Sequence, residues 1–196
     1  SIDDGLASET EQTYIYKTLT NDDTGPSELY LGKNDVGIRF KNVALTSNKT
    51  IIDSATLMFH VSNVDDHSRK SVNLNVKAEI RESGNNMDAS RGNNINAGMK
   101  YNPRIWGERE TSVSIDVTDI IQQAVTTNLQ QQSKLTNGED VIVYIYNDAN
   151  EYQNAHRRAF GHSWNKGYLA PSLYIKTKPI ENENAMKISG RTFDNV

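Results

Sequence analysis

The sequence predicts an all-β protein: an antiparallel β-sandwich of jelly-roll type with one short helix. Two stretches of strict alternation support this prediction, because apolar and polar side chains take turns along residues 54–62 and again along residues 71–80. Such alternation is typical of strands buried on one face only. About eight short strands and one helix in a chain of 196 residues without cysteine fit one sandwich domain.

Short runs rich in aromatic and β-branched residues predict the other strands of the first half. These runs are residues 12–17, 29–31 and 36–43, with the turn-forming stretch 21–28 between the first two. The two alternating strands follow and are joined by the charged loop 63–70. Residues 81–105 are rich in Asn and Gly, so we expect a long ordered loop with a short strand near residues 97–101.

A strand that leads directly into a helix is predicted in the second half. Residues 112–117 alternate as a strand, and Asp116, Thr118 and Asp119 are residue types that cap helices. Residues 120–125 have apolar side chains at helical spacing, so we expect one short helix that frays beyond them.

The last two predicted strands differ in character. Residues 140–147 are apolar on both faces, as in a central strand that is covered on both sides. Residues 172–176 form the final strand, with Pro171 at its start, where a missing N–H is tolerated. Between them, residues 157–171 read as a Gly-punctuated loop that carries arginine, histidine and tryptophan.

The polar stretches at the two ends of the sequence set the predicted domain boundaries. Residues 1–11 read as a flexible leader, residues 12–178 as the β-sandwich domain, and residues 179–196 as a polar tail or linker. No apolar run approaches the ~20 residues that span a bilayer. No signal peptide is visible, so we expect a mature form or an excised domain.

Composition narrows the function classes. The formal net charge of −4, with scattered Lys and Arg, argues against a nucleic-acid partner. Acidic, Asn-rich chains without cysteine are common among secreted and surface proteins of bacteria, so we expect an extracellular location. The chain has no cysteine nucleophile, Gly-rich phosphate loop or H-E-x-x-H motif, so we expect no enzyme activity.

Several short motifs occur in a recognisable order. They are VGIRFKNV at residues 36–43, the pattern I-x-x-A-x-L at 52–57, D-V-T at 116–118, S-R at 90–91 before P-R-I-W at 103–106, and P-x-L at 171–173. In this order, over roughly residues 12–177, the chain resembles the DNRLRE-type β-sandwich domains and the related alginate-binding carbohydrate-binding modules. The resemblance implies a secreted, non-catalytic module of surface or pilus-associated bacterial proteins. It does not fix the ligand.

Polysaccharide binding is the function we expect. A sugar offers apolar C–H faces and hydroxyls, so its site combines aromatic platforms with polar groups, and arginine suits uronate carboxylates. Loop-like stretches supply both kinds of side chain. The expected ligand contacts are Trp164, Arg157, Arg158, Tyr168, His162, Trp106, Tyr101 and Tyr152. The plainer interpretation of the two tryptophans is that they seal the ends of the core.

Acidic turns suggest a structural calcium ion. Asp22 with Asp23 and Asp65 with Asp66 offer carboxylate oxygens in turns, although acidic turns also serve solubility alone. His156 and His162, with Asp148 or Glu151, are a second candidate metal set. The plainer interpretation is that these histidines lie on surface loops.

We therefore expect a non-catalytic extracellular binding or adhesion module that recognises a polysaccharide or surface glycan. The alternative is a structural subunit or spacer of a surface filament or a multidomain adhesin, without a small ligand. In that case residues 1–11 or 180–193 would pair with the sheet edge of another copy or a neighbouring domain.

Overall fold

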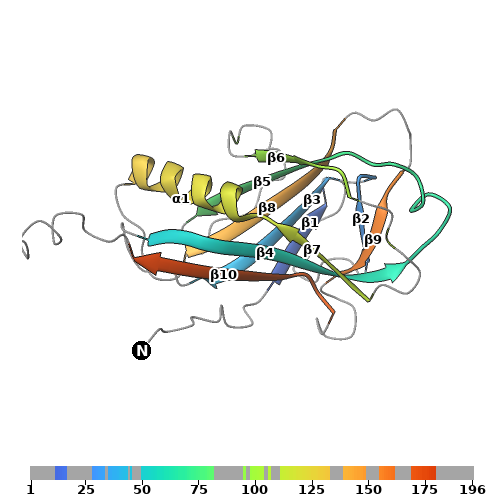
Figure 1. The fold of residues 1–196 in the computed structure, drawn as a ribbon, viewed down its shortest axis with the longest axis horizontal. Helices are drawn as coiled ribbons and strands as arrows, with labels where there is room; N and C mark the ends of the chain where they lie inside the picture. The colour runs from blue at the N-terminus through green and yellow to red at the C-terminus, as the bar shows by residue number, and fades with distance from the viewer. Residues whose placement is uncertain are drawn as a thin grey trace, which may run out of the picture.

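The computed structural model describes residues 12–16, 28–33, 35–43, 45, 50–81, 95, 98–103, 106, 111–132, 139–148, 155–161 and 169–179. Within these residues the chain forms ten strands and one helix (Figure 1). The strands are β1 (Gln12–Tyr16), β2 (Glu28–Leu31), β3 (Val36–Val43), β4 (Thr50–Asn63), β5 (Leu74–Arg81), β6 (Gly98–Tyr101), β7 (Ser112–Asp116), β8 (Glu139–Asn147), β9 (Arg157–Phe160) and β10 (Ser172–Pro179). The helix is α1 (Thr118–Gln132).

The strands form two antiparallel sheets. The first sheet has the order β1-β3-β8-β5-β6, and the second has the order β10-β4-β9-β2, with β7 also paired to β4. Every described strand pairing is antiparallel. The predicted antiparallel β-sandwich with one helix is therefore confirmed.

The strand pairings are nested along the chain. β5 pairs with β6, β4 with β7, β3 with β8 and β2 with β9. Each pair therefore encloses the previous one in the sequence, as in a long hairpin. A jelly roll needs such nesting because its two sheets arise from one long antiparallel ribbon. The pairing agrees with the jelly-roll subtype, which stays a prediction.

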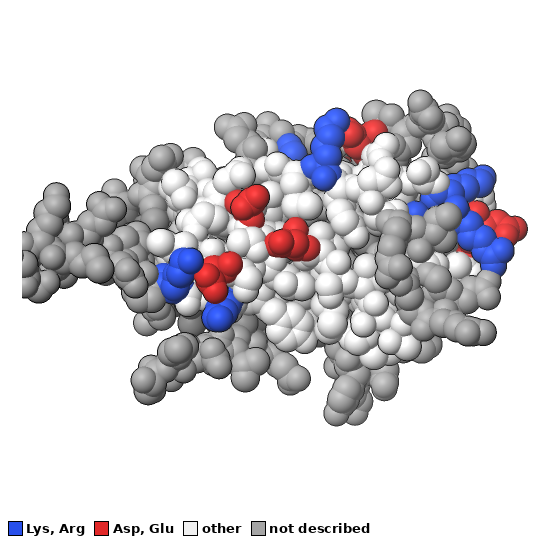
Figure 2. All heavy atoms as spheres, in the orientation of Figure 1, with Lys and Arg blue, Asp and Glu red and all other residues white. Residues whose placement is uncertain are grey.

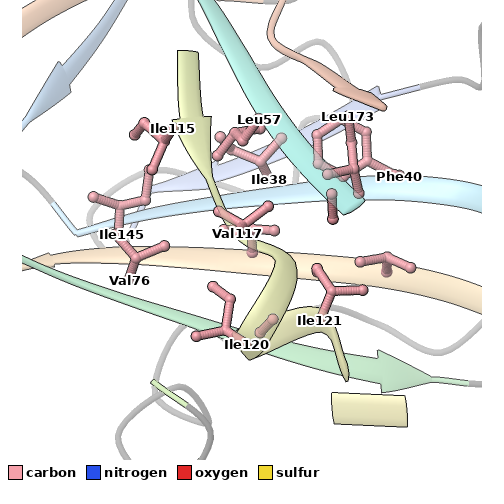
Figure 3. Packing of buried hydrophobic residues seen from close by; sticks show 14 of the residues in the cluster. Ile38, Phe40, Leu57, Val76, Ile115, Val117, Ile120, Ile121, Ile145 and Leu173 are labelled. Carbon is pink, nitrogen blue, oxygen red and sulfur yellow. The ribbon is translucent and has the colours of Figure 1, made fainter. Parts of the chain in front are cut away.

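The core lies between the two sheets, where the inward side chains of both meet (Figure 3). Ile38 and Ile145 reach it from the first sheet and Leu57 from the second, while Ile120 and Ile121 reach it from α1. Alternate side chains of a strand point into the core and away from it. In β5, Leu74, Val76, Ala78 and Ile80 are buried, whereas the residues between them are partly exposed.

Strand β8 is buried on both faces, as its sequence predicts. Val141, Val143 and Ile145 point into the main core. Ile142, Tyr144 and Tyr146 form a second small cluster on the other face, and Ile95 packs against it. The hydroxyl of Tyr144 donates to Glu79 at 2.7 Å. Burial, and then that hydrogen bond, raise the pKa of Tyr144.

The start of α1 is tied to β4 by side chains. The carboxylate of Asp116 accepts hydrogen bonds from the backbone N–H and the hydroxyl of Thr118, at 3.0 and 2.6 Å. These two bonds lower the pKa of Asp116. The Thr118 hydroxyl oxygen accepts from the N–H of Ala55 at 2.9 Å, and Gln122 accepts from the N–H of Ile52 at 2.7 Å. The D-V-T motif therefore joins strand, helix and sheet.

Two elements differ from the sequence-based prediction. Helix α1 continues to Gln132 rather than fraying after residue 125, because Leu and Gln favour helix and the Asn128 amide is anchored on the carbonyl of Ile80 at 3.1 Å. Residues 157–160 form strand β9 instead of the predicted loop. Four residues that include two arginines show too little apolar alternation to predict a strand. They form one because they pair with β2 and β4.

Candidate functional site

Strand β9 places two neighbouring arginines on opposite faces of the second sheet. Arg157 points inward and is fully buried, while Arg158 is partly exposed on the outer face. Successive side chains on a strand point to opposite sides, so this separation follows directly from the strand. The two arginines, predicted together as ligand contacts, therefore lie in different environments.

The buried guanidinium of Arg157 donates hydrogen bonds to three backbone carbonyls. Its Nη1 donates to the carbonyls of Lys70 and His156 at 2.9 and 3.1 Å, and its Nη2 donates to Pro103 at 3.1 Å. Burial lowers the pKa of its guanidinium. Arg157 thus joins the loop after β4, the chain before β9 and the chain after β6 at one end of the sandwich.

Arg158 lies on the outer face opposite Tyr30 of β2. Its Nη2 donates to Glu28 at 2.5 Å, and its guanidinium carbon lies 5.2 Å from the centre of the Tyr30 ring. The Tyr30 hydroxyl also donates to Glu28, at 3.0 Å. Burial raises the pKa of Glu28, but the hydrogen bonds, first that from Arg158, outweigh burial and lower it overall.

Asp65 fixes the loop between β4 and β5 onto this face. Its Oδ1 accepts from the backbone N–H and the hydroxyl of Ser68 at 2.8 and 2.9 Å. Its Oδ2 lies 3.3 Å from His156 Nε2 and 3.5 Å from Arg158 Nη1. Burial alone would raise the pKa of Asp65, yet the bonds from Ser68 and the neighbouring His156 lower it.

Three rings gather beside these charges. The buried imidazole of His156 meets Tyr30 edge-on, with ring centres 5.3 Å apart. The exposed imidazole of His67 stacks on His156 at 5.7 Å. We call Glu28, Tyr30, Asp65, His67, His156 and Arg158 the end cluster, because they occupy the β2–β9 end of the second sheet.

Basic residues lie near the end cluster: Lys33 in space, and Arg69 and Lys70 in the chain, directly after Ser68, which bonds to Asp65. Lys33, Arg69 and Lys70 are exposed, and Lys33 Nζ lies 5.4 Å from the centre of the Tyr30 ring. Figure 2 shows basic and acidic side chains gathered at the right-hand end of the molecule, where Figure 1 places the loop after β4. The end cluster therefore combines rings, a guanidinium and exposed cations on one surface.

Trp106 and Tyr101 lie elsewhere. Trp106 is buried in the main core, 6.4 Å from Phe59 between ring centres, and its Nε1 has no hydrogen-bond partner among the described residues. The core-sealing interpretation fits this position. Tyr101 ends β6 and packs against the core while partly exposed. The other predicted ligand contacts, Trp164, Tyr168, His162 and Tyr152, lie outside the described residues.

Of the four predicted calcium ligands, two lie within the described residues and two lie outside them. Asp65 is described, and both of its oxygens already have hydrogen-bond donors, so a cation there would have to displace them. Asp66 is exposed. Asp22 and Asp23 lie outside the described residues. In the described part of the chain, no three His, Asp or Glu side chains are grouped so that they could hold a metal ion.

The structure adds Glu28, Tyr30 and His67 to the candidate site. Residues i and i+2 of a strand share a face, so Glu28 and Tyr30 were readable as neighbours from the sequence. Their proximity to Asp65 and Arg158, positions far away in the chain, depends on the pairing of β2 with β9. No spacing in the sequence indicates it.

Comparisons with known proteins give no family. The sequence matches no protein-family model, and no curated protein matches it significantly. A chain in a solved structure of Desmodium yellow mottle tymovirus is 8% identical, over 87% of this chain and 82% of that chain, with a TM-score of 0.27. A likeness this weak supports no conclusion. Among the described helical residues, no helix is long and apolar enough to cross a membrane.

Proposed function

We propose that this protein is a non-catalytic extracellular binding module that recognises an acidic polysaccharide through the end cluster. One observation carries the proposal: aromatic and imidazole rings lie beside Arg158, with the exposed Lys33 over the Tyr30 ring and the exposed Arg69 and Lys70 directly after Ser68, which bonds to Asp65. Rings match the apolar faces of sugars, and cations match their carboxylates. The bacterial cell surface is the proposed location.

The charges of the end cluster suit a shallow, reversible contact. Arg158 is already paired with Glu28 and Asp65. Its main role is therefore to orient the Tyr30 ring, and the charge for binding a carboxylate comes from other residues. The exposed Lys33 and Lys70 can meet a carboxylate without leaving a buried partner behind. Because exposed charges are screened by salt, binding should weaken as ionic strength rises.

A titration with alginate tests the proposal. We expect the double variant Arg69→Ala/Lys70→Ala to bind alginate about tenfold more weakly than the wild type, or about 1.4 kcal/mol. The matched control is Lys77→Ala/Lys100→Ala, which removes the same charge from β5 and β6 of the other sheet. Equal loss in both double variants would mean nonspecific attraction, and no binding by the wild type would contradict the proposal.

Calcium is tested in the same titration. We also propose a structural calcium ion, held by acidic turns such as that of Asp66. Binding that is lost in EDTA and restored by added Ca²⁺ would support the ion. Binding that is unchanged in EDTA would contradict a calcium requirement and leave the polysaccharide proposal intact.

A further inference from the structure

The outer face of the second sheet continues from the end cluster towards β10. Arg158 lies opposite Asn63 of β4, and farther along the same strand Thr56 lies opposite both Tyr174 of β10 and Asp116 of β7. Positions 56 and 63 are separated by roughly 20 Å at the usual rise of a strand. The end cluster and Tyr174 are thus two points on one long surface.

This surface is mostly uncharged and rich in hydroxyls. None of its outward side chains in β4, β7 and β10 is buried. The uncharged ones include Ser54, Thr56, Met58, His60, Ser62, Ser112, Ser114, Ser172 and Tyr174. Asp116 of β7, opposite Thr56, is the acidic side chain of these outward rows. Figure 2 shows a broad face that is mainly uncharged between a charged group at the left and the charged end at the right, with two acidic groups within it.

Tyr174 projects from β10, at the edge of this surface. It is 49% exposed and is the only large hydrophobic side chain exposed among the described residues. Side chains on a strand stand roughly perpendicular to the sheet, so the ring rises above the neighbouring hydroxyls. An exposed aromatic ring on a flat polar sheet is suited to stack against a flat ligand.

Cations lie at both ends of the surface. The end cluster is bordered by Lys33, Arg69 and Lys70, and β10 carries the exposed Lys176 and Lys178 beyond Tyr174. Lys176 and Lys178 share one partner, Asp53, at 3.7 and 3.0 Å, so their summed charge is only partly compensated. Positive charge at two points about 20 Å apart or more is complementary to an extended polyanion.

A protein partner fits this surface less well. Sheets that pack face to face bury apolar side chains against each other, and the outward rows here are mainly serine and threonine. The core of a stable protein interface is likewise rich in apolar and aromatic residues. A single tyrosine among hydroxyls does not provide that core.

We propose that the ligand is a linear acidic polysaccharide that lies along the outer face of the second sheet, from the end cluster to Tyr174. This inference rests on the proposed function and adds the shape of the ligand and a second contact. One sugar ring stacks on Tyr174, the hydroxyl rows bond to sugar hydroxyls, and carboxylates meet the cations at both ends. A short oligosaccharide can occupy only one end.

Alginate oligosaccharides of defined length test the inference by calorimetry. We expect the wild type to bind an octasaccharide at least about tenfold more tightly than a trisaccharide. Tyr174→Ala should weaken octasaccharide binding about five- to tenfold, as expected for a lost stacking contact, and leave trisaccharide binding at the end cluster unchanged. Tyr174→Phe, which keeps the ring, should bind the octasaccharide nearly as well as the wild type.

The outcomes separate the inference from the function on which it rests. Equal affinity for both lengths, or an octasaccharide affinity that Tyr174→Ala does not change, would overturn the extended site while leaving binding at the end cluster. Failure of the wild type to bind either length would contradict the proposed function as well. Sedimentation showing a dimer that Tyr174→Ala dissociates would instead assign the surface to a second copy.

Discussion

Arg157 and Arg158 show how much a single position in a strand decides. They are adjacent and chemically identical, yet the buried Arg157 bonds to three backbone carbonyls and Arg158 bonds to carboxylates on the outer face. The inward arginine joins separate loops and stabilises the fold. The outward arginine holds Tyr30 and Asp65 in place on the surface where we propose that a ligand binds.

Arg157→Lys is expected to lower the free energy of unfolding by about 2–4 kcal/mol. Lysine cannot reach the three carbonyls at once, and each buried acceptor left without a donor costs about 1–3 kcal/mol. Urea denaturation measures the change. Arg158→Lys is the control, because it keeps a cation beside Glu28 at a partly exposed site and should cost less. A wild-type stability for Arg157→Lys would refute the structural role.

Asp65 should make stability depend on acid pH. Its pKa is lowered in the folded protein, so its contribution is fully present above the unfolded value of about 3.9 and is lost as pH falls below it. We expect Asp65→Asn to destabilise the protein by about 1.5–3 kcal/mol at pH 7, as for hydrogen bonds to a charged group.

The difference between Asp65→Asn and the wild type should shrink as the pH is lowered below 4, because the Asp65 carboxyl of the unfolded wild type then takes up protons while that of the folded protein stays charged. Denaturation at pH 7, 5 and 3 follows this change. A difference that stays constant over this range would show that the mutation acts through packing and not through the charge. Asp66→Asn, at the exposed neighbouring position, serves as the control.

At the scale of elements, the end of β2 depends on a glycine. Gly32 has a φ of +98°, and a Cβ there would lie 2.5 Å from Cγ2 of Val72 and 3.2 Å from the carbonyl oxygen of Ala155. Its own carbonyl accepts a hydrogen bond from Asn147 at 2.6 Å. The turn therefore brings β2 against the loop before β5, the end of β8 and the start of β9.

Gly32→Ala is expected to destabilise the protein by about 1–3 kcal/mol, because the new side chain requires both a strained backbone and a shift of Val72. Thermal or urea denaturation measures this cost. Gly98→Ala in β6 is the matched control: its φ is not positive, and the closest atom is Cγ of the flexible Lys77 at 3.0 Å. Equal costs for the two variants would contradict the role assigned to Gly32.

Strand β10 carries features that oppose pairing with another sheet. It lies at the end of its sheet, has a register shift between Lys176 and Thr177, and ends in Lys178 and Pro179. Charged side chains, bulges and proline are the usual means by which edge strands avoid association. This edge supports a binding module over a filament subunit that would pair through β10.

At the scale of the whole molecule, we predict that these features keep the protein from associating through β10. Lys176→Thr/Lys178→Thr should increase concentration-dependent association, measured by sedimentation velocity. Lys77→Thr/Lys100→Thr, which removes equal charge from the other sheet, should not. Filaments formed by the wild type at high concentration would favour the alternative of a structural subunit.

The sequence predicted the strands that alternate cleanly. The two strict alternations became β4 and β5, and the run apolar on both faces became the central strand β8. Strand β9 was missed because four residues with two arginines show no usable period. The true length of α1 was missed because part of its stability comes from the contact of Asn128 with Ile80.

The predicted site likewise could not be assembled from the sequence, because its residues meet only through tertiary contacts. Arg158 and Asp65 were singled out for different roles, as ligand contact and metal ligand, and they form one ion pair. Glu28 and Tyr30 had no sequence signal beyond their i, i+2 spacing on a strand. Trp106 shows that an aromatic residue in an Asn-rich stretch can belong to the core, which composition alone could not decide.

The sequence by itself determined the antiparallel sandwich, because the alternation of side chains along a strand is a local property that needs no partner. Only the tertiary structure decided which charged residues meet, because cross-strand partners such as Tyr30 and Arg158 are distant in the chain. The register of β9 buries Arg157 and presents Arg158, and a shift of one residue would exchange their roles.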